Sequence, residues 1–305
     1  MNDLIKLKRT NCSKLDDILG VSFNVLDHGF IRLIDYMGTD ESIVQAARVS
    51  YGKGTKKISD DRGLIRYLMR HRHTTPFEMC EIKLHVKVPM DCWRQWIRHR
   101  TANVNEYSTR YSIAIIDKFK TLPDKWRLQK KDNKQGSLGT VDLKLGSYLS
   151  KKEEEFQDFA QKIYDERIEQ GVAREQARKD LPLSNYTEAF WKIDLHNLLH
   201  FLELRLSETA QYEIKEYAKI IGFDIVKKWC PITWEAFEEY RLNSIDLSSF
   251  EIEVIKQIFS GNHREIRRIC LQRKILLNNY DPNPKSRERI ELETKLIKLG
   301  INIPW

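Results

Sequence analysis

The sequence predicts an α+β fold, because strand patterns in the first third of the chain are followed by helical patterns. Residues 23–36 alternate loosely between apolar and polar positions around a turn at 27–29, and residues 81–88 alternate cleanly. Residues 151–169 and 187–221 instead repeat apolar side chains at helical spacing. The segment 187–221 is the longest of these patterns, so we expect one long helix there.

Shorter helices are expected around the strands. Residues 42–49 place apolar side chains on one side, and residues 64–69 form a second short helical pattern. Pro89 ends the second strand and opens a helix that runs to about Arg98. Gln95 and Arg98 share one face of this helix, so they can reach one ligand together.

The segment Thr75-Pro76-Phe77-Glu78 has the form of a helix start. Thr75 can cap the helix, Pro76 suits the first helical position, and Glu78 can complete a capping box. Free N–H groups at such a start attract anions. A single helical turn with no ligand explains the pattern equally well.

The chain is expected to have three parts. Residues 1–22 form an N-terminal extension, residues 23–240 the main domain, and residues 241–305 a helical C-terminal extension. A surface insertion at about 117–150 is poor in apolar residues and rich in Lys, Gly, Ser and Asn.

Composition indicates the kind of partner. The formal charge of +8 favours anionic partners, and we expect small polyanions rather than nucleic acid, because the central cations alternate with His, Asn and Ser. No apolar run reaches the roughly 18 residues of a membrane helix, and no secretory segment is visible, so we expect a cytoplasmic protein. The five cysteines are scattered and predict free thiols.

The most informative segment is 98–112. Arg98, His99 and Arg100 are followed by Glu106, Ser108 and Arg110. Such a cluster repels itself unless an anion lies in it, which predicts a site for phosphates and a planar ring. A stacking surface for nucleic acid is the competing interpretation, since Trp93, Trp96, Tyr107 and Tyr111 alternate with arginines.

Helical geometry groups further polar residues in 187–221. The buried leucine stripe of this segment consists of Leu195, Leu198, Leu199, Leu202 and Leu206. A rotation of 100° per residue places Asp194 and Arg205 within about 20° of each other beside this stripe. His196 and His200 lie on another flank and have metal-ligand spacing. A paired core arginine and a hydrogen-bonded histidine pair are the structural alternatives, and we expect no metal.

Several motifs together resemble the flavin-dependent thymidylate synthases. Arg98-His99-Arg100, seven residues and then Ser108 is similar to the signature of that family. The resemblance extends continuously from about Val25 to Tyr240. Its other segments are 46–50, 71–78, 177–182 and 195–205.

The resemblance implies the thymidylate synthase-complementing-protein fold, with an antiparallel sheet core and long helices. It also implies reductive methylation of dUMP to dTMP. The carbon would come from 5,10-methylenetetrahydrofolate and the electrons from NADPH, FAD would relay them, and tetrahydrofolate would be released. The sites would be shared between the subunits of a homotetramer that binds neither nucleic acid nor a membrane.

The resemblance also implies roles for individual residues. Arg205 would be catalytic, at the pyrimidine edge, where it favours ionisation at N3. The residues expected to bind FAD are Ser50, His73, Thr75, Glu78, Arg98, His99, Arg100, Thr101, Glu106, Asp194, Leu195, His196 and His200. Those expected to bind dUMP are Gln95, Trp96, Ile97, Arg98, Glu106, Tyr107, Ser108, Thr109, Arg110, Arg178 and Arg205.

Two departures from the family pattern stand out. Asp194 replaces a common Asn, and residues 207–209 read Ser-Glu-Thr where Asp-Ser-His is frequent.

The sequence offers no evident nucleophile. No cysteine lies within the Arg98–Arg110 cluster, and no relay that would activate Ser108 is evident. We therefore expect Ser108 to bind the phosphate or the ring.

Overall fold

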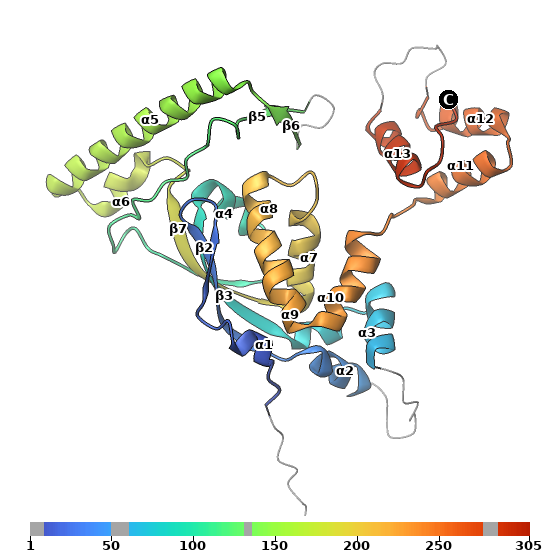
Figure 1. The fold of residues 1–305 in the computed structure, drawn as a ribbon, viewed down its shortest axis with the longest axis horizontal. Helices are drawn as coiled ribbons and strands as arrows, with labels where there is room; N and C mark the ends of the chain where they lie inside the picture. Colours follow the sequence, from blue (N-terminus) through green and yellow to red (C-terminus); the bar gives the residue numbers. More distant parts are fainter. Residues whose placement is uncertain (1–8, 50–60, 131–135, 277–285) are drawn as a thin grey trace, which may run out of the picture. The chain divides into compact units, whose positions relative to one another are not determined.

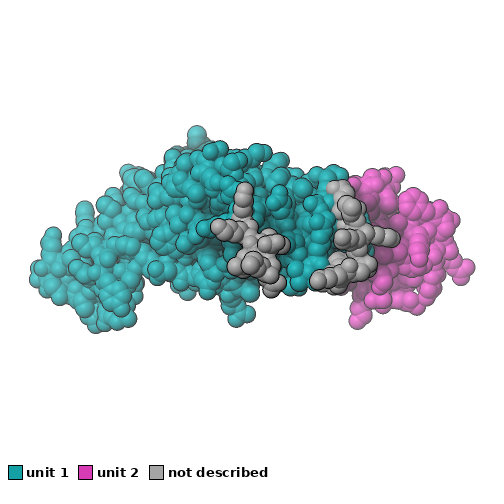
Figure 2. All heavy atoms as spheres, turned by 90° about the horizontal axis from the view of Figure 1, so that it is seen from below, with its two compact units in different colours: residues 1–242 teal, residues 243–305 magenta. Residues whose placement is uncertain are grey.

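A computed structural model describes residues 9–49, 61–130, 136–276 and 286–305. The chain divides into two compact units, residues 1–242 and residues 243–305, which Figure 2 shows in teal and magenta. Each unit has a hydrophobic cluster of its own. In the described part of the chain, no helix is long and apolar enough to cross a membrane.

The first unit is built on a five-stranded sheet in the order β1-β2-β3-β7-β4, in which every neighbouring pair is antiparallel (Figure 1). The strands are β1 (Ser22–Val25), β2 (Gly29–Met37), β3 (Glu81–Pro89), β4 (Asn103–Glu106) and β7 (Tyr186–Asp194). Both strand patterns of the first third are confirmed, and so is the α+β class. In β3 the alternation of the sequence becomes an alternation of buried and half-buried side chains.

The expected long helix over 187–221 is wrong. Its first part is β7, which pairs along its whole length with β3 and near its end with β4. Helix α7 (Leu195–Arg205) follows, and α8 (Tyr212–Lys219) begins after a break. The aromatic and β-branched residues of β7 suit a strand that is paired on both sides, whereas the leucine stripe begins only at Leu195.

Short helices complete the first unit, and α7 and α8 lie beside each other against the sheet (Figure 1). A group of aromatic side chains fills the space beneath them. The ring of Trp96 lies edge to face with that of Trp191 at 5.2 Å and tilted against that of Phe201 at 5.0 Å.

Most other helices of the first unit are short. These short helices include α1 (Ser13–Asp16), α2 (Asp40–Val49), α3 (Asp61–Arg70), α4 (Met90–Trp96), α9 (Lys227–Trp229) and α10 (Pro231–Phe237), with a 3₁₀ turn at Thr75–Met79 and π-helical turns at Ile220–Val226 and Glu238–Leu242.

The region of the expected insertion contains regular structure. Strands β5 (Arg127–Gln129) and β6 (Ser137–Thr140) pair, and α5 (Leu143–Glu169) begins eight residues before the predicted start at 151. Asp142 caps this helix by accepting from the Leu145 N–H at 3.0 Å. Leu143, Leu145 and Tyr148 in its first turns are exposed, and Gly146 lies where a side chain would collide with the Pro123 carbonyl.

Two short helical turns follow α5, namely α6 (Arg174–Ala177) and the 3₁₀ turn Arg178–Asp180. The second unit consists of α11 (Ser249–Phe259), α12 (His263–Gln272) and α13 (Arg287–Lys298). Ser248 and Glu251 form a capping box at the start of α11. The C-terminal extension is therefore helical, as its sequence predicts.

Candidate functional site

The Arg-His-Arg segment and the end of α7 meet in the folded chain. Arg205 Nε donates to His99 Nε2 at 3.1 Å, and Arg205 Nη2 donates to the Gln95 carbonyl at 3.4 Å. The His99 ring also lies 4.9 Å from that of Phe201 and 6.0 Å from that of His200. Residues assigned from two distant motifs thus form one contact group.

Burial controls the charge of this group. Burial, the Arg205 guanidinium and His200, in that order of size, together lower the pKa of His99 to about 4. Burial also lowers the pKa of Arg205 from its usual value. Because His99 is neutral near pH 7, its Nε2 can accept from Arg205 and hold the guanidinium in one orientation.

A second contact group joins the end of the signature to the turns after α5. Arg178 donates to Thr109, and Arg110 forms an ion pair with Glu175 at 3.0 Å. Arg174 donates to the Tyr111 carbonyl at 2.6 Å. Three arginines therefore lie at the end of the loop that carries Ser108, and such cations can bind a phosphate.

A third group surrounds a cavity of about 180 Å³. His73 lines it from the segment before the 3₁₀ turn, and His196 and His200 line it from α7. The remaining lining residues are Leu68, Met69, Arg72, Thr74, Phe77, Leu199, Glu203, Phe237 and Arg241. Apolar walls with imidazoles and cations suit a planar ring that carries phosphates, although a cavity of this size would hold only a part of a dinucleotide.

Asp194 has a local role in this structure. It is the N-cap of α7 and accepts from the Asn197 N–H at 2.9 Å and from Asn197 Nδ2 at 2.7 Å. Arg205 stands at the other end of the same helix, roughly 16 Å away at 1.5 Å per residue. The two residues share a flank, but they form no ion pair in the described part of the chain.

Several assigned residues are exposed in the single chain. Arg98, Arg100 and Thr101 lie before β4, Glu106 lies on β4 at the edge of the sheet, and Tyr107 follows it directly. Glu106 accepts from the Thr187 hydroxyl at 2.9 Å. These side chains face solvent, so a ligand or a second chain can reach them.

The other assigned residues differ in exposure. Thr75 and Glu78 are exposed on the 3₁₀ turn, where Thr74 is the N-cap and no side-chain cap forms, so the expected cap at Thr75 is wrong. Trp96 and Leu195 are fully buried, whereas Ile97 is exposed. Ser50 lies outside the described residues.

Sequence reasoning missed two polar residues beside this site. Gln211 accepts from Gln95 Nε2 and donates to Asp91 Oδ2 at 3.1 Å. Gln211 occupies the N-cap of α8, a position where Ser, Thr, Asp or Asn is preferred. That mismatch is the signal in the sequence that could have pointed to it.

Comparison with known proteins identifies the family. The thymidylate synthase complementing protein family matches residues 32–232. A flavin-dependent thymidylate synthase of Wolbachia pipientis wMel is 53% identical over 256 residues, covering 84% of this chain and 90% of the relative. One from Rickettsia typhi (strain ATCC VR-144 / Wilmington) is 52% identical over 268 residues, covering 83% and 90%.

A solved structure agrees with this result. The crystal structure of the UMP/dUMP methylase PolB from Streptomyces cacaoi, bound with 5-Br dUMP, superposes with a TM-score of 0.62 at 29% identity. The superposition covers 72% of this chain and 98% of the PolB chain. The chain therefore belongs to the thymidylate synthase complementing protein family, that of the flavin-dependent thymidylate synthases.

Proposed function

We propose that this flavin-dependent thymidylate synthase methylates dUMP to dTMP with carbon from 5,10-methylenetetrahydrofolate, electrons from NADPH and FAD as the relay. Tetrahydrofolate is the folate product. The observation that supports the proposal is the convergence of Arg205, His99 and Gln95, in which the guanidinium donates to the His99 ring and to the Gln95 carbonyl. The free thiols fit a reducing compartment, and we place the enzyme in the cytoplasm.

Arg205 is the residue to which we assign the pyrimidine edge. Its guanidinium stabilises the negative charge that develops on the ring as C5 becomes nucleophilic. His99 accepts from Nε and the Gln95 carbonyl accepts from Nη2, which leaves Nη1 to face the ring. Because His99 is neutral, it orients Arg205 without adding a second positive charge that would repel it.

The second contact group, around the loop of Ser108, would bind the phosphate of dUMP. Arg110 and Arg178 bring positive charge to the loop of Ser108, and the Ser108 hydroxyl can donate to a phosphate oxygen. Arg98 and Gln95, on one face of α4 and its continuation, hold the nucleotide from the other side.

The third contact group would hold FAD. His73, His196 and His200 would contact the ring system, while Arg98, Arg100 and Thr101 would meet its phosphates. When bound, FAD supplies hydride transfer, which no side chain of the protein can provide. The protein residues contribute orientation, charge and the exclusion of water.

We also propose a homotetramer whose sites are shared between subunits. The contacts within the chain divide the assigned residues into separate groups, and the Arg98–Tyr107 segment is largely exposed in the single chain. Anionic ligands would bind where exposed cations of one subunit meet the groups of another. Light scattering of the flavin-loaded protein measures the assembly.

The reaction is tested by product analysis. The purified protein should show flavin absorbance, and dTMP should form only when both methylenetetrahydrofolate and NADPH are supplied. The folate product should be tetrahydrofolate. Dihydrofolate accumulating one-for-one with dTMP would mean that the folate supplies the electrons, and a colourless protein that carries nucleic acid would support the competing binding function.

A further inference from the structure

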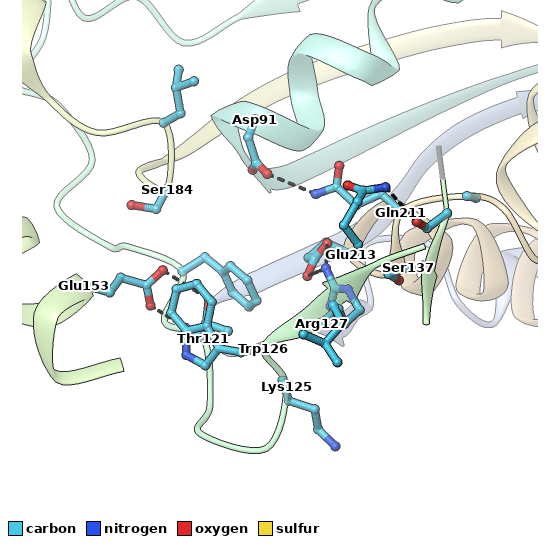
Figure 3. A pocket seen from close by; sticks show the side chains of 16 residues that line it. Asp91, Thr121, Lys125, Trp126, Arg127, Ser137, Glu153, Ser184, Gln211 and Glu213 are labelled. Carbon is cyan, nitrogen blue, oxygen red and sulfur yellow. Dashed lines mark hydrogen bonds and ion pairs between the residues drawn. The ribbon is translucent and has the colours of Figure 1, made fainter. Parts of the chain in front are cut away.

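Gln211 occupies a helix-capping position but does not cap the helix. It is the N-cap residue of α8, and its side chain makes no hydrogen bond to the first turn. Both ends of its amide are used elsewhere: Nε2 donates to Asp91 Oδ2 at 3.1 Å and Oε1 accepts from Gln95 Nε2. Figure 3 shows the bond between Asp91 and Gln211 in the wall of a cavity.

The three side chains form a directional series. An ionised carboxylate only accepts hydrogen bonds, so the NH₂ group of Gln211 must face Asp91 and its oxygen must face Gln95. That oxygen only accepts as well, so the NH₂ group of Gln95 must face Gln211. The amide oxygen of Gln95 is then the polar atom of this side chain that no member of the series binds. It has no hydrogen-bond partner in the described part of the chain.

The elements that carry Asp91 and Gln211 are each held by further contacts. Asp91 belongs to α4, and its backbone N–H donates to the Leu183 carbonyl at 3.0 Å. Two residues after Gln211, Glu213 is 4% exposed and accepts from Arg127 Nη2 at 2.6 and 2.9 Å. Figure 3 shows this pair on the same cavity wall, so α8 is fixed at its start by two side chains that reach different elements.

Gln95, the last member of this series, also contacts Arg205, the proposed catalytic residue. Its backbone carbonyl accepts from Arg205 Nη2 at 3.4 Å, while its side-chain amide is held by Gln211. We propose that Asp91 and Gln211 are positioning residues that turn the amide of Gln95 so that its oxygen, an acceptor, faces the nucleotide. The inference rests on the proposed role of Gln95 in binding dUMP.

The chemistry of the ligand follows from this orientation. An amide oxygen recognises an N–H or O–H donor, and dUMP offers the 3′-hydroxyl of its sugar, whereas N3–H is the group that Arg205 is expected to ionise. A flipped amide would present NH₂ to the same donor, so the bond would be lost. The loss of one neutral hydrogen bond corresponds to about a tenfold weaker binding of dUMP.

The test breaks the hydrogen bond between positions 91 and 211 and then restores it in the opposite direction. In Gln211→Glu the side chain at 211 becomes an anion, and repulsion by the Asp91 carboxylate turns it away, so the NH₂ group of Gln95 loses its acceptor. We expect the calorimetric Kd and the steady-state KM for dUMP to rise about tenfold, with kcat and flavin content unchanged. In Asp91→Asn/Gln211→Glu the introduced amide donates to the introduced carboxylate, which still accepts from Gln95, so both constants should return close to those of the unmodified enzyme.

Gln129→Glu is the matched control, because it makes the same change in the wall of the same cavity without a bond to Gln95. It should leave the Kd for dUMP unchanged. If Gln211→Glu fails to fold, Gln211→Ala replaces it, with the same rise in Kd expected and no rescue by Asp91→Asn. Failure of the double variant to restore binding, or a Kd unchanged in every variant, would overturn the proposal.

These outcomes are separable from the proposed function. If the unmodified enzyme makes no dTMP, the function fails whatever the variants do. If it makes dTMP but Gln211→Glu lowers only kcat or flavin content, the function stands and the positioning role of Gln211 is wrong.

Discussion

Arg205 and His99 lie 106 positions apart in the sequence and are joined by a hydrogen bond of 3.1 Å between Nε and Nε2. The acceptor is an imidazole whose pKa burial lowers to about 4. A protonated imidazole could not accept this bond and would repel the guanidinium. The orientation of the proposed catalytic arginine therefore depends on a histidine that stays neutral throughout the physiological pH range.

Arg205→Ala should lose most dTMP formation while keeping FAD. A charge-assisted hydrogen bond at the pyrimidine edge contributes about 1.5–3 kcal/mol, so we expect kcat/KM to fall by roughly 10- to 150-fold. Flavin absorbance and the thermal midpoint report on cofactor and fold. Loss of flavin together with loss of fold would assign Arg205 a structural role.

His99 should make stability depend on pH. Its folded pKa of about 4 lies below the reference value of 6.5. Between these values the unfolded chain binds a proton that the folded chain does not, so His99 lowers the stability as the pH falls from 6.5 towards 4. Urea unfolding at pH 7.5 and pH 5 should show a larger loss for the unmodified protein than for His99→Gln. His28→Gln, at an exposed histidine, is the control and should leave the loss unchanged.

The Arg127–Glu213 pair should stabilise the start of α8. Breaking a buried pair costs about 3–5 kcal/mol, and because Arg127 is 28% exposed we expect Arg127→Met to cost about 2 kcal/mol. Lys125→Met, at an exposed pair with Asp124, should change the free energy of unfolding by no more than about 0.5 kcal/mol. Equal effects of the two substitutions would contradict the role of the buried pair.

No covalent adduct between the protein and dUMP should form. Cys80, Cys92, Cys230 and Cys270 are buried, and burial raises the pKa of Cys92 and Cys230 and raises that of Cys270 to about 11. Single Cys→Ala variants and Ser108→Ala should still turn over, the last with weaker dUMP binding. Mass spectrometry of trapped turnover mixtures checks this, and an adduct on a cysteine or on Ser108 would refute the assignment.

The C-terminal unit should be dispensable for the chemistry. Its core of Val254, Ile266, Cys270, Ile275, Leu292 and Leu296 lies within residues 243–305, and no assigned site residue belongs to it. A chain ending at Leu242 should bind FAD and form dTMP at a rate close to that of the full chain. A soluble, flavin-loaded truncated protein without turnover would give the tail a catalytic role.

Local patterns in the sequence were sufficient to predict part of this fold. The alternation in 23–36 and 81–88 placed two strand regions correctly, whereas the anion site indicated by Arg98, His99 and Arg100 before Ser108 stays a prediction. Each of these signals comes from neighbouring residues, whose side-chain directions are set by the repeat of the backbone. The α+β class and the family resemblance rested on such signals and are confirmed.

Contacts between distant segments decided the rest. Residues 187–194 are a strand because β3 and β4 pair with them on both sides, and no window of the sequence contains those partners. Asp194 caps a helix that begins only where this strand ends. The low pKa of His99 and the orientation of Gln95 by Gln211 both depend on burial and on bonds across more than 100 positions. Composition and periodicity carry no information on such bonds, because desolvation and hydrogen-bond direction exist only after the chain has folded.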